Sequence, residues 1–175
     1  TICGLPVRTL ANHLFYFRVA GEPIIQRLII PNSVENVGPF TFIGCFLPYI
    51  DVLPGNLLFT SEDGVLFSAD RSRLIVCPPG KSGNYVIPEG VTVIGQRAFF
   101  ACREMQSVII PEGITSIESY SFSYCYSLTE LVIPDGVTAI GDVAFRTCES
   151  LSSITLPRSL TSIGLGAFYD CKALT

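Results

Sequence analysis

The sequence predicts a solenoid, in which short repeats stack on one another and form a single elongated domain. Four prolines, from Pro88 to Pro157, recur at one constant spacing, and a cysteine follows each of them at a constant offset. The proline–cysteine pairs are Pro31–Cys45, Pro88–Cys102, Pro111–Cys125, Pro134–Cys148 and Pro157–Cys171. Between the paired residues the same pattern of apolar side chains returns in each copy. A repeat of about 23 residues cannot bury its own apolar side, so successive copies must stack to share one core.

Each repeat has three predicted parts. Residues 131–133 form a short strand, because side chains alternate between inward and outward positions, and Pro134 ends it because proline cannot donate to a strand ladder. A turn at 135–136 leads to a second extended piece at 137–141. Residues 144–148 are then expected to form one helical or 3₁₀ turn that brings the chain back.

The inward side chains of successive repeats are expected to form columns in a shared core. The predicted columns are Ile110, Ile133 and Leu156; Val108, Leu131 and Ile154; and Phe99, Phe122, Phe145 and Phe168.

The repeat cysteines are predicted to be buried free thiols. Neighbours in such a row lie about 5 Å apart with parallel side chains, whereas a disulfide needs facing Cβ atoms about 3.8 Å apart. Cys3 and Cys77 fall outside the row, and a disulfide between them is an open alternative. Because no Cys-x-x-Cys pair occurs, no zinc site is expected, and no other metal or cofactor site is predicted.

One insertion interrupts the series, because Pro31 and Pro88 are more than two repeat periods apart. Within it, residues 65–67 and 74–76 are predicted to form a β-hairpin that either extends the sheet or projects from one flank. The predicted units of the single domain 1–175 are a degenerate repeat at 4–27, a repeat at 28–52, a hairpin insert at 53–84, and regular repeats at 85–107, 108–130, 131–153 and 154–175. Since the last copy stops in mid-pattern, the chain is expected to be a fragment of a longer protein.

Composition and charge argue against several classes of function. The net charge is −4 with only two lysines, so no nucleic-acid partner is expected, because such binders carry a basic stripe. No run of about 18 apolar residues occurs, so no membrane span is expected in this segment. His13 is the only histidine, and its repeat position holds unrelated residues in other copies. An enzyme of the Ser-His-Asp or Cys-His type is therefore not expected.

The outward positions of the strands are the predicted interaction face. The residues at this register are Ile29, Val86, Ile109, Val132 and Thr155, with polar neighbours Gln26, Arg27, Asn84, Gln106 and Glu130. An exposed apolar stripe of this kind is typical of interaction sites. Two alternatives stay open, which are the β-propensity of apolar residues in an exposed strand and packing against further parts of a longer chain.

The repeat resembles the BspA-like class of leucine-rich repeats. The string from Ile133 to Leu151 carries the resemblance, and the insert sequence from Glu62 to Val91 is similar to a second hallmark of that class. The resemblance implies a leucine-rich-repeat solenoid with a right-handed β/α superhelix of about 23-residue repeats. It also implies a secreted or surface-anchored bacterial protein that adheres to host matrix proteins or to other microbes.

Two functions remain as predictions from the sequence. The first is a non-catalytic extracellular adhesion module that uses the strand face. The alternative is a structural spacer within a larger surface protein. End-to-end self-association through uncapped terminal repeats is a further expectation, because solenoid ends normally carry polar caps.

Overall fold

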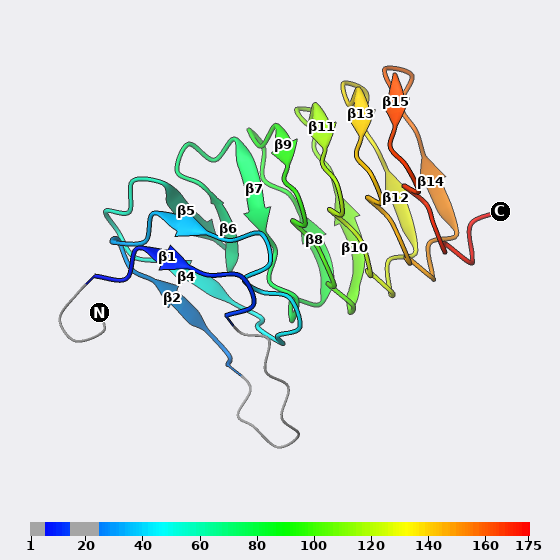
Figure 1. Ribbon diagram of the computed structural model, residues 1–175. Coiled ribbons are helices and arrows are strands. Elements are labelled where there is room, and N and C mark those ends of the chain that lie inside the picture. Colours follow the sequence, from blue (N-terminus) through cyan, green and yellow to red (C-terminus); the bar gives the residue numbers. More distant parts are fainter. Residues whose placement is uncertain (1–5, 15–24) are drawn as a thin grey trace.

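The computed structural model describes residues 6–14 and 25–175, which form a β-solenoid of about six turns (Figure 1). Strands lie in two rows along the coil, so the predicted solenoid is confirmed. The first row contains β2 (Leu28–Ile30), β4 (Ile50–Val52), β8 (Gly83–Val86), β10 (Met105–Ile109), β12 (Glu130–Val132) and β14 (Ser153–Thr155). The second row contains β1 (Thr9–Leu10), β3 (Asn36–Val37), β9 (Val93–Ile94), β11 (Ser116–Ile117), β13 (Ala139–Ile140) and β15 (Ser162–Ile163).

Parallel pairing between successive turns builds both rows. In the first row, β2 pairs with β4, β8 with β10 and β12 with β14, while β10 lies beside β12. In the second row, β9, β11, β13 and β15 form a continuous parallel ladder, and β1 pairs with β3. Equivalent residues of repeats that follow one another at the constant period therefore stand next to each other, whereas β4 and β8, on either side of the insertion, make no direct contact.

The insertion contains one hidden turn of the solenoid and one hairpin. Strand β4 pairs with β2, and Pro54 follows it one full period after Pro31, so this segment begins a turn of its own. Pro54 and Pro88 are further apart than one period, and the extra length between them accommodates two more strands. These are β5 (Phe59–Glu62) and β6 (Val65–Ser68), which pair antiparallel with each other.

The insert extends the second row and does not project from the molecule. Strand β7 (Arg73–Val76) pairs antiparallel with β6 and parallel with β9. The result is a seven-stranded sheet in the order β15-β13-β11-β9-β7-β6-β5. The insert thus supplies three strands instead of the two expected from the sequence, and the third is β5.

Strand β6 lies between two hydrophobic cores. Val65 and Phe67 belong to the larger core, which continues through the C-terminal repeats, whereas Leu66 belongs to a smaller core around Ile30 and Phe42. Side chains of a strand alternate between its two faces, so both faces of β6 are buried. The insert therefore joins the two halves of the solenoid through apolar packing on either side.

An ion pair also ties the insert to the repeats. The guanidinium of Arg73 donates two hydrogen bonds to the carboxylate of Glu118, at 2.8 and 2.7 Å. The backbone N–H of Gln96 donates a third, and together with the Arg73 bonds it holds the pKa of Glu118 below its usual value. Gly95 lies between Arg73 and Glu118. A Cβ added at Gly95 would come within 3.2 Å of the Arg73 guanidinium and 2.8 Å of the Leu74 carbonyl oxygen. Glycine there leaves room for the arginine to reach across.

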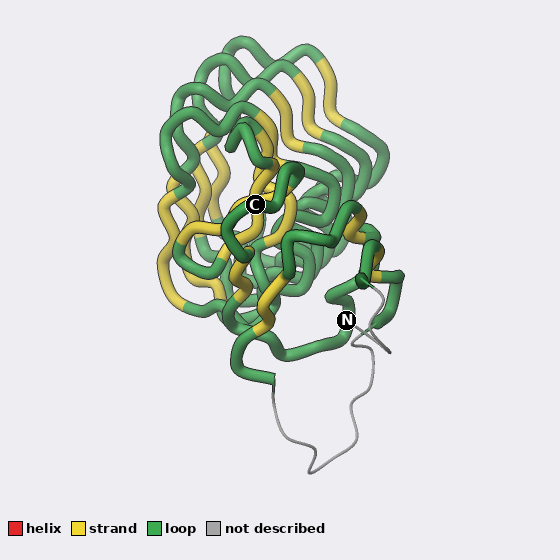
Figure 2. The backbone as a smooth tube through the Cα atoms, turned by 90° about the vertical axis from the view of Figure 1, so that its left-hand side faces the viewer, coloured by secondary structure: helices red, strands yellow, loops and turns green. Residues whose placement is uncertain are grey.

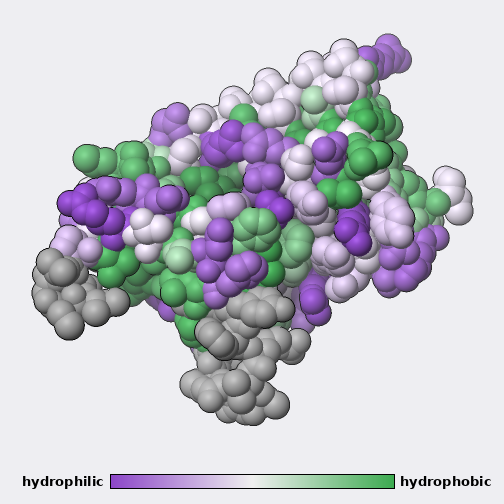
Figure 3. All heavy atoms as spheres, in the orientation of Figure 1, coloured by the Kyte–Doolittle hydropathy of each residue, from purple (hydrophilic) through white to green (hydrophobic). Residues whose placement is uncertain are grey.

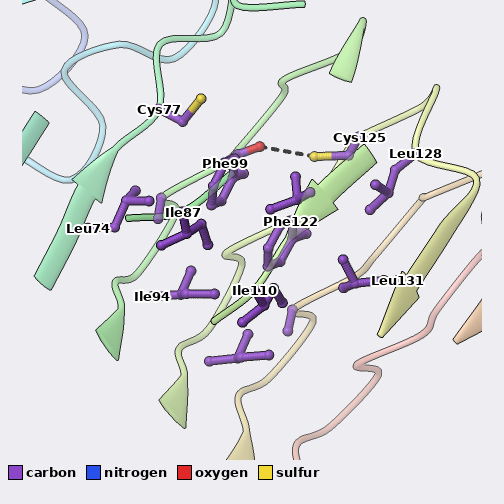
Figure 4. Close-up of a cluster of buried hydrophobic side chains, with 14 of the residues drawn as sticks. Leu74, Cys77, Ile87, Ile94, Phe99, Ile110, Phe122, Cys125, Leu128 and Leu131 are labelled. Atoms are coloured by element: carbon purple, nitrogen blue, oxygen red, sulfur yellow. Dashed lines mark hydrogen bonds between the residues drawn. The ribbon is translucent and has the colours of Figure 1, made fainter. Parts of the chain in front are cut away.

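The larger core has the predicted columns (Figure 4). The ring of Phe122 stacks between Phe99 and Phe145, with centroid distances of 4.7 and 5.2 Å. One predicted core residue, Leu156, is instead exposed. The turn of Leu156 packs against a neighbouring turn on one side only. The equivalent residues Ile110 and Ile133 have a turn on each side and are buried.

The return segments contain no helix in the described ranges, which corrects the predicted helical or 3₁₀ turn and leaves the β/α superhelix unconfirmed (Figure 2). Two positions of each segment adopt left-handed backbone angles, which interrupt any helical hydrogen-bond series. These residues are Arg97, Tyr120, Val143 and Gly166 at the first position, and Ala101, Tyr124, Thr147 and Asp170 at the second. Alternate N–H groups then donate to the next turn, as from Phe99 to Ser121 at 2.7 Å.

The repeat cysteines are free thiols, and all except Cys45, which donates to Phe42 within its own turn, donate to backbone carbonyls of the preceding turn. Cys125, Cys148 and Cys171 each donate to a core phenylalanine carbonyl at 3.1 Å, as Figure 4 shows for Cys125 and Phe99. Cys77 is also a buried free thiol, and Cys3 lies outside the described residues. A thiol is small enough for this column and still supplies a weak donor.

Because the repeat thiols are buried or half-buried, we expect the folded protein to lose stability at alkaline pH. Burial raises the pKa of Cys45 to about 11, above the unfolded value of about 8.5. Since the folded state favours the neutral thiol, its contribution is complete below about pH 8.5 and is lost as pH rises towards 11. Urea unfolding of the wild type and of Cys45→Ala between pH 7 and pH 11 should show a stability difference that shrinks over this range. A difference that stays constant with pH would contradict this assignment.

Candidate interaction surfaces

The first candidate surface is the outward side of the first strand row. Val86, Ile109 and Val132 are 59%, 60% and 64% exposed, although each neighbours a buried inward residue on its own strand. They stand on three successive strands, with Ile109 in register with Val86 and Val132 in register with Thr155. The predicted interaction residues Gln26, Arg27, Ile29, Asn84, Val86, Gln106, Ile109, Glu130, Val132 and Thr155 are all exposed.

The apolar run is shorter than the sequence indicates. Asp51 is the register partner of Ile29, and its strand β4 comes between β2 and β8 in the first row. Asp51 forms an ion pair with Arg27, whose guanidinium also lies 5.1 Å from the centre of the Tyr49 ring. Ile29 is thus separated from Val86 by a charged pair. The signal that would have revealed this is the spacing of one full period between Pro31 and Pro54.

We call the continuous part of this surface the strand face, defined by Val86, Ile109 and Val132 with the polar residues beside them. The polar residues are Asn84, Gln106, Ser107, Glu130 and Thr155. Ser107 donates a hydrogen bond to Asn84 at 2.9 Å, which links two neighbouring strands beside the apolar run. Gln26, Arg27 and Ile29 lie beyond Asp51 and form a separate area. Figure 3 shows polar and apolar groups interspersed on the side of the molecule that it displays.

The second candidate surface was not anticipated from the sequence. Aromatic rings and arginines of successive return segments contact one another on the outside of the coil. We call this the return surface, and its members are Phe40, Arg97, Phe100, Arg103, Tyr120, Tyr124, Tyr126, Arg146 and Tyr169.

One group of the return surface centres on Arg97. Its guanidinium lies between two rings, 4.0 Å from the centre of Phe40 and 4.4 Å from that of Tyr120. Burial between these rings lowers the pKa of Arg97 from its usual value. His13 stacks on Phe40 at a centroid distance of 5.6 Å, so the side chains at this repeat position contact one another in a row from His13 to Tyr120.

A second group centres on Tyr124. Its ring contacts Phe100 and Tyr126 edge to face, with centroid distances of 5.3 and 6.2 Å. Arg146 lies between Tyr124 and Tyr169, at 5.8 and 5.4 Å from the ring centres. Arg103 lies 5.4 Å from the centre of Tyr126. Tyr124 has a left-handed backbone angle, which the periodic apolar pattern of the sequence does not reveal.

Within residues 6–14 and 25–175, no group of three or more His, Cys, Asp or Glu side chains is arranged to hold a metal ion. In the same ranges, no helix has the length and apolar character needed to cross a membrane.

Comparisons with known proteins identify the repeat. The family model described as the BspA type leucine-rich repeat region matches residues 81–175 with six copies. No curated protein matches the sequence.

Solved structures with similar folds come from bacteria. A leucine-rich cell surface protein from Faecalibacterium prausnitzii is 30% identical with a TM-score of 0.64, over 86% of this chain and 46% of that one. The pneumococcal vaccine antigen PcpA is 24% identical with a TM-score of 0.64, over 86% and 44% of the respective chains. A leucine-rich repeat protein from Eubacterium ventriosum is 23% identical with a TM-score of 0.59, over 85% and 53%. The chain spans about half of the length of these structures.

Proposed function

Because this chain belongs to the BspA-type leucine-rich repeat family, we propose that it is a non-catalytic protein-interaction module that binds its partner through the strand face. The observation that carries the proposal is the run of three exposed apolar side chains, Val86, Ile109 and Val132, on adjacent strands. Exposed β-branched side chains on a rigid sheet lose little conformational entropy on binding. Their polar neighbours supply the rim that such interfaces usually have.

We place the module on the outside of a bacterial cell, as a secreted or surface-attached adhesion protein. The Faecalibacterium prausnitzii structure, described as a cell surface protein, supports this location. The partner that fits is a protein of the host matrix or of another microbe, because the strand face offers apolar contacts with a polar rim. A spacer would need no apolar residues at these outward positions.

Charging the strand face tests the proposal. The double variant Ile109→Glu with Val132→Glu should keep its fold, because both side chains point away from the core. Binding should fall by roughly 100-fold or more, since two buried apolar contacts are replaced by charges that must lose water. The measurement is surface plasmon resonance against immobilised fibronectin, laminin, collagen and mucin. Size-exclusion chromatography and circular dichroism report the assembly state and the fold of each variant.

A matched control keeps the result specific. The double variant Leu57→Glu with Leu165→Glu makes the same chemical change at two highly exposed positions off the strand face. It should bind as the wild type does. Equal binding by the strand-face variant and the wild type would exclude this surface as the site. If the wild type binds no member of the panel, the spacer function replaces the interaction module.

A further inference from the structure

Seven of the eight arginines in the described ranges fall into two groups with different partners, and Arg158 belongs to neither group. Four of them form ion pairs with carboxylates, namely Arg8, Arg27, Arg71 and Arg73. Three others, Arg97, Arg103 and Arg146, have no ion pair within the described ranges and lie against aromatic rings of the return surface. An arginine held this way keeps its charge and several donors while its side-chain motion is restricted. The return surface therefore presents three guanidiniums that form no ion pair with a carboxylate of the described residues.

Arg146 is the best prepared of the three to accept an anion. It lies between Tyr124 and Tyr169, and its Nε atom is buried with no hydrogen-bond acceptor among the described residues. Because the Nε atom has no contact with solvent, the donors of this partly exposed side chain that an anion can reach are its Nη groups. Arg103 is exposed and reaches the same group of rings through Tyr126. Two guanidiniums are thus linked by a continuous chain of ring contacts.

The tyrosine rings beside these arginines are suited to stacking against a sugar ring. Tyr169 is exposed, and Tyr124 and Tyr126 are half-buried with their hydroxyl groups available for hydrogen bonds. An aromatic ring offers a flat apolar surface, and a tyrosine adds a polar tip. The C–H groups of a pyranose ring pack against such a surface, while its hydroxyl groups need polar partners nearby.

We propose that Arg103, Arg146 and the three tyrosines bind a short acidic saccharide that carries a single carboxylate, such as a terminal sialic acid. The carboxylate accepts hydrogen bonds from Arg146, in the pairing that a planar guanidinium favours. The sugar ring stacks on Tyr169, and Arg103 beside Tyr126 supplies the second guanidinium of the site. This surface is separate from the strand face, so the inference does not depend on the proposed protein partner.

The net charge of the molecule favours a saccharide with one carboxylate over a densely sulfated polymer. The net charge is −4, so a densely sulfated polymer meets long-range repulsion. Lys172, which also lies in this region, is already paired with Glu149 at 2.7 Å and with Asp170 at 3.9 Å. The two guanidiniums, each held against tyrosine rings, do not form the extended basic stripe that a polyanion requires.

Calorimetric titration with 3′-sialyllactose tests the proposal, and lactose serves as the ligand control because it lacks only the acidic sugar. The wild type should bind sialyllactose at least roughly tenfold more tightly than lactose, as expected for one charge-assisted pairing. Equal binding of the two sugars, or saturable binding of neither, overturns the proposal. Tighter binding of a heparin tetrasaccharide than of sialyllactose also overturns it, in favour of a polyanion.

Matched variants locate the site. Arg146→Gln and Arg103→Gln should each weaken sialyllactose binding, whereas Arg158→Gln makes the same charge change at an exposed turn and should have no effect. Tyr169→Ala should weaken binding and Tyr169→Phe should not. Melting temperatures verify the fold, and the exposed Arg103 keeps the test decisive if Arg146→Gln proves unstable. Equal affinities of Arg103→Gln and Arg158→Gln would exclude this surface. The strand-face double variant should still bind the saccharide, which separates this result from the proposed protein binding.

Discussion

Phe122→Ala is expected to lower the free energy of unfolding by about 3–5 kcal/mol. The side chain is fully buried and stacks between Phe99 and Phe145, so its removal opens a cavity in the middle of the larger core. Neighbouring turns are held by backbone hydrogen bonds on both sides, as from Phe122 to Ala144 at 2.7 Å, and cannot collapse into the space. Urea unfolding followed by circular dichroism measures the change.

Phe46→Ala is the control for this substitution. Phe46 is an exposed phenylalanine of the smaller, N-terminal half, so its removal should change the free energy of unfolding by no more than about 0.5 kcal/mol. Similar losses in the two variants would show that the phenylalanine column is not the main source of core stability.

Leu66→Ala should cost about 2–5 kcal/mol and should also separate the unfolding of the two halves. Leu66 is the residue of β6 that packs into the smaller core, while Val65 and Phe67 on the same strand pack into the larger one. Stability in a solenoid is a sum of repeat and interface contributions, so weakening one interface lowers the cooperativity across it. We expect one unfolding transition in the wild type and two in the variant, with the N-terminal half unfolding first.

Hydrogen exchange of backbone amides assigns the two transitions to the two halves. Amides around Ile30 and Ile50 should lose protection in the variant, while those around Ile117 and Ile140 should keep it. Leu57→Ala is the control, because the same substitution in the neighbouring exposed segment removes no core contact. A single transition with uniform loss of protection would show that the two cores unfold as one unit despite the weakened interface.

Much of the fold follows from spacing alone. The proline and cysteine periods place Phe99, Phe122 and Phe145 in one column and Val86, Ile109 and Val132 on the outside, and the structure confirms both. These assignments hold because each repeat contacts its immediate neighbours in a constant register. A residue's role can then be inferred from its position in the repeat.

The conformation of the return segments does not follow from spacing. The segment from Ala144 to Cys148 has the length and composition of a helical turn, yet Val143 and Thr147 adopt left-handed angles. Bonding to the next turn decides this conformation, as when the N–H of Thr147 donates to the carbonyl of Tyr169 at 2.8 Å. Local propensity gives no indication of such a bond, because the partner lies one turn further along the chain.

By itself, the sequence determined the solenoid, its period, its core columns and the outward positions of its strands, because these depend on contacts between adjacent repeats. Only the tertiary structure decided that the insertion hides a turn, that Asp51 divides the outward row, and that β6 is buried between two cores. It also decided that Arg103 and Arg146 meet tyrosines of other turns. The physical reason is that these contacts join residues whose separation in the sequence departs from the repeat period, or residues beside left-handed corners of the backbone. Such residues come close together only in the folded solenoid.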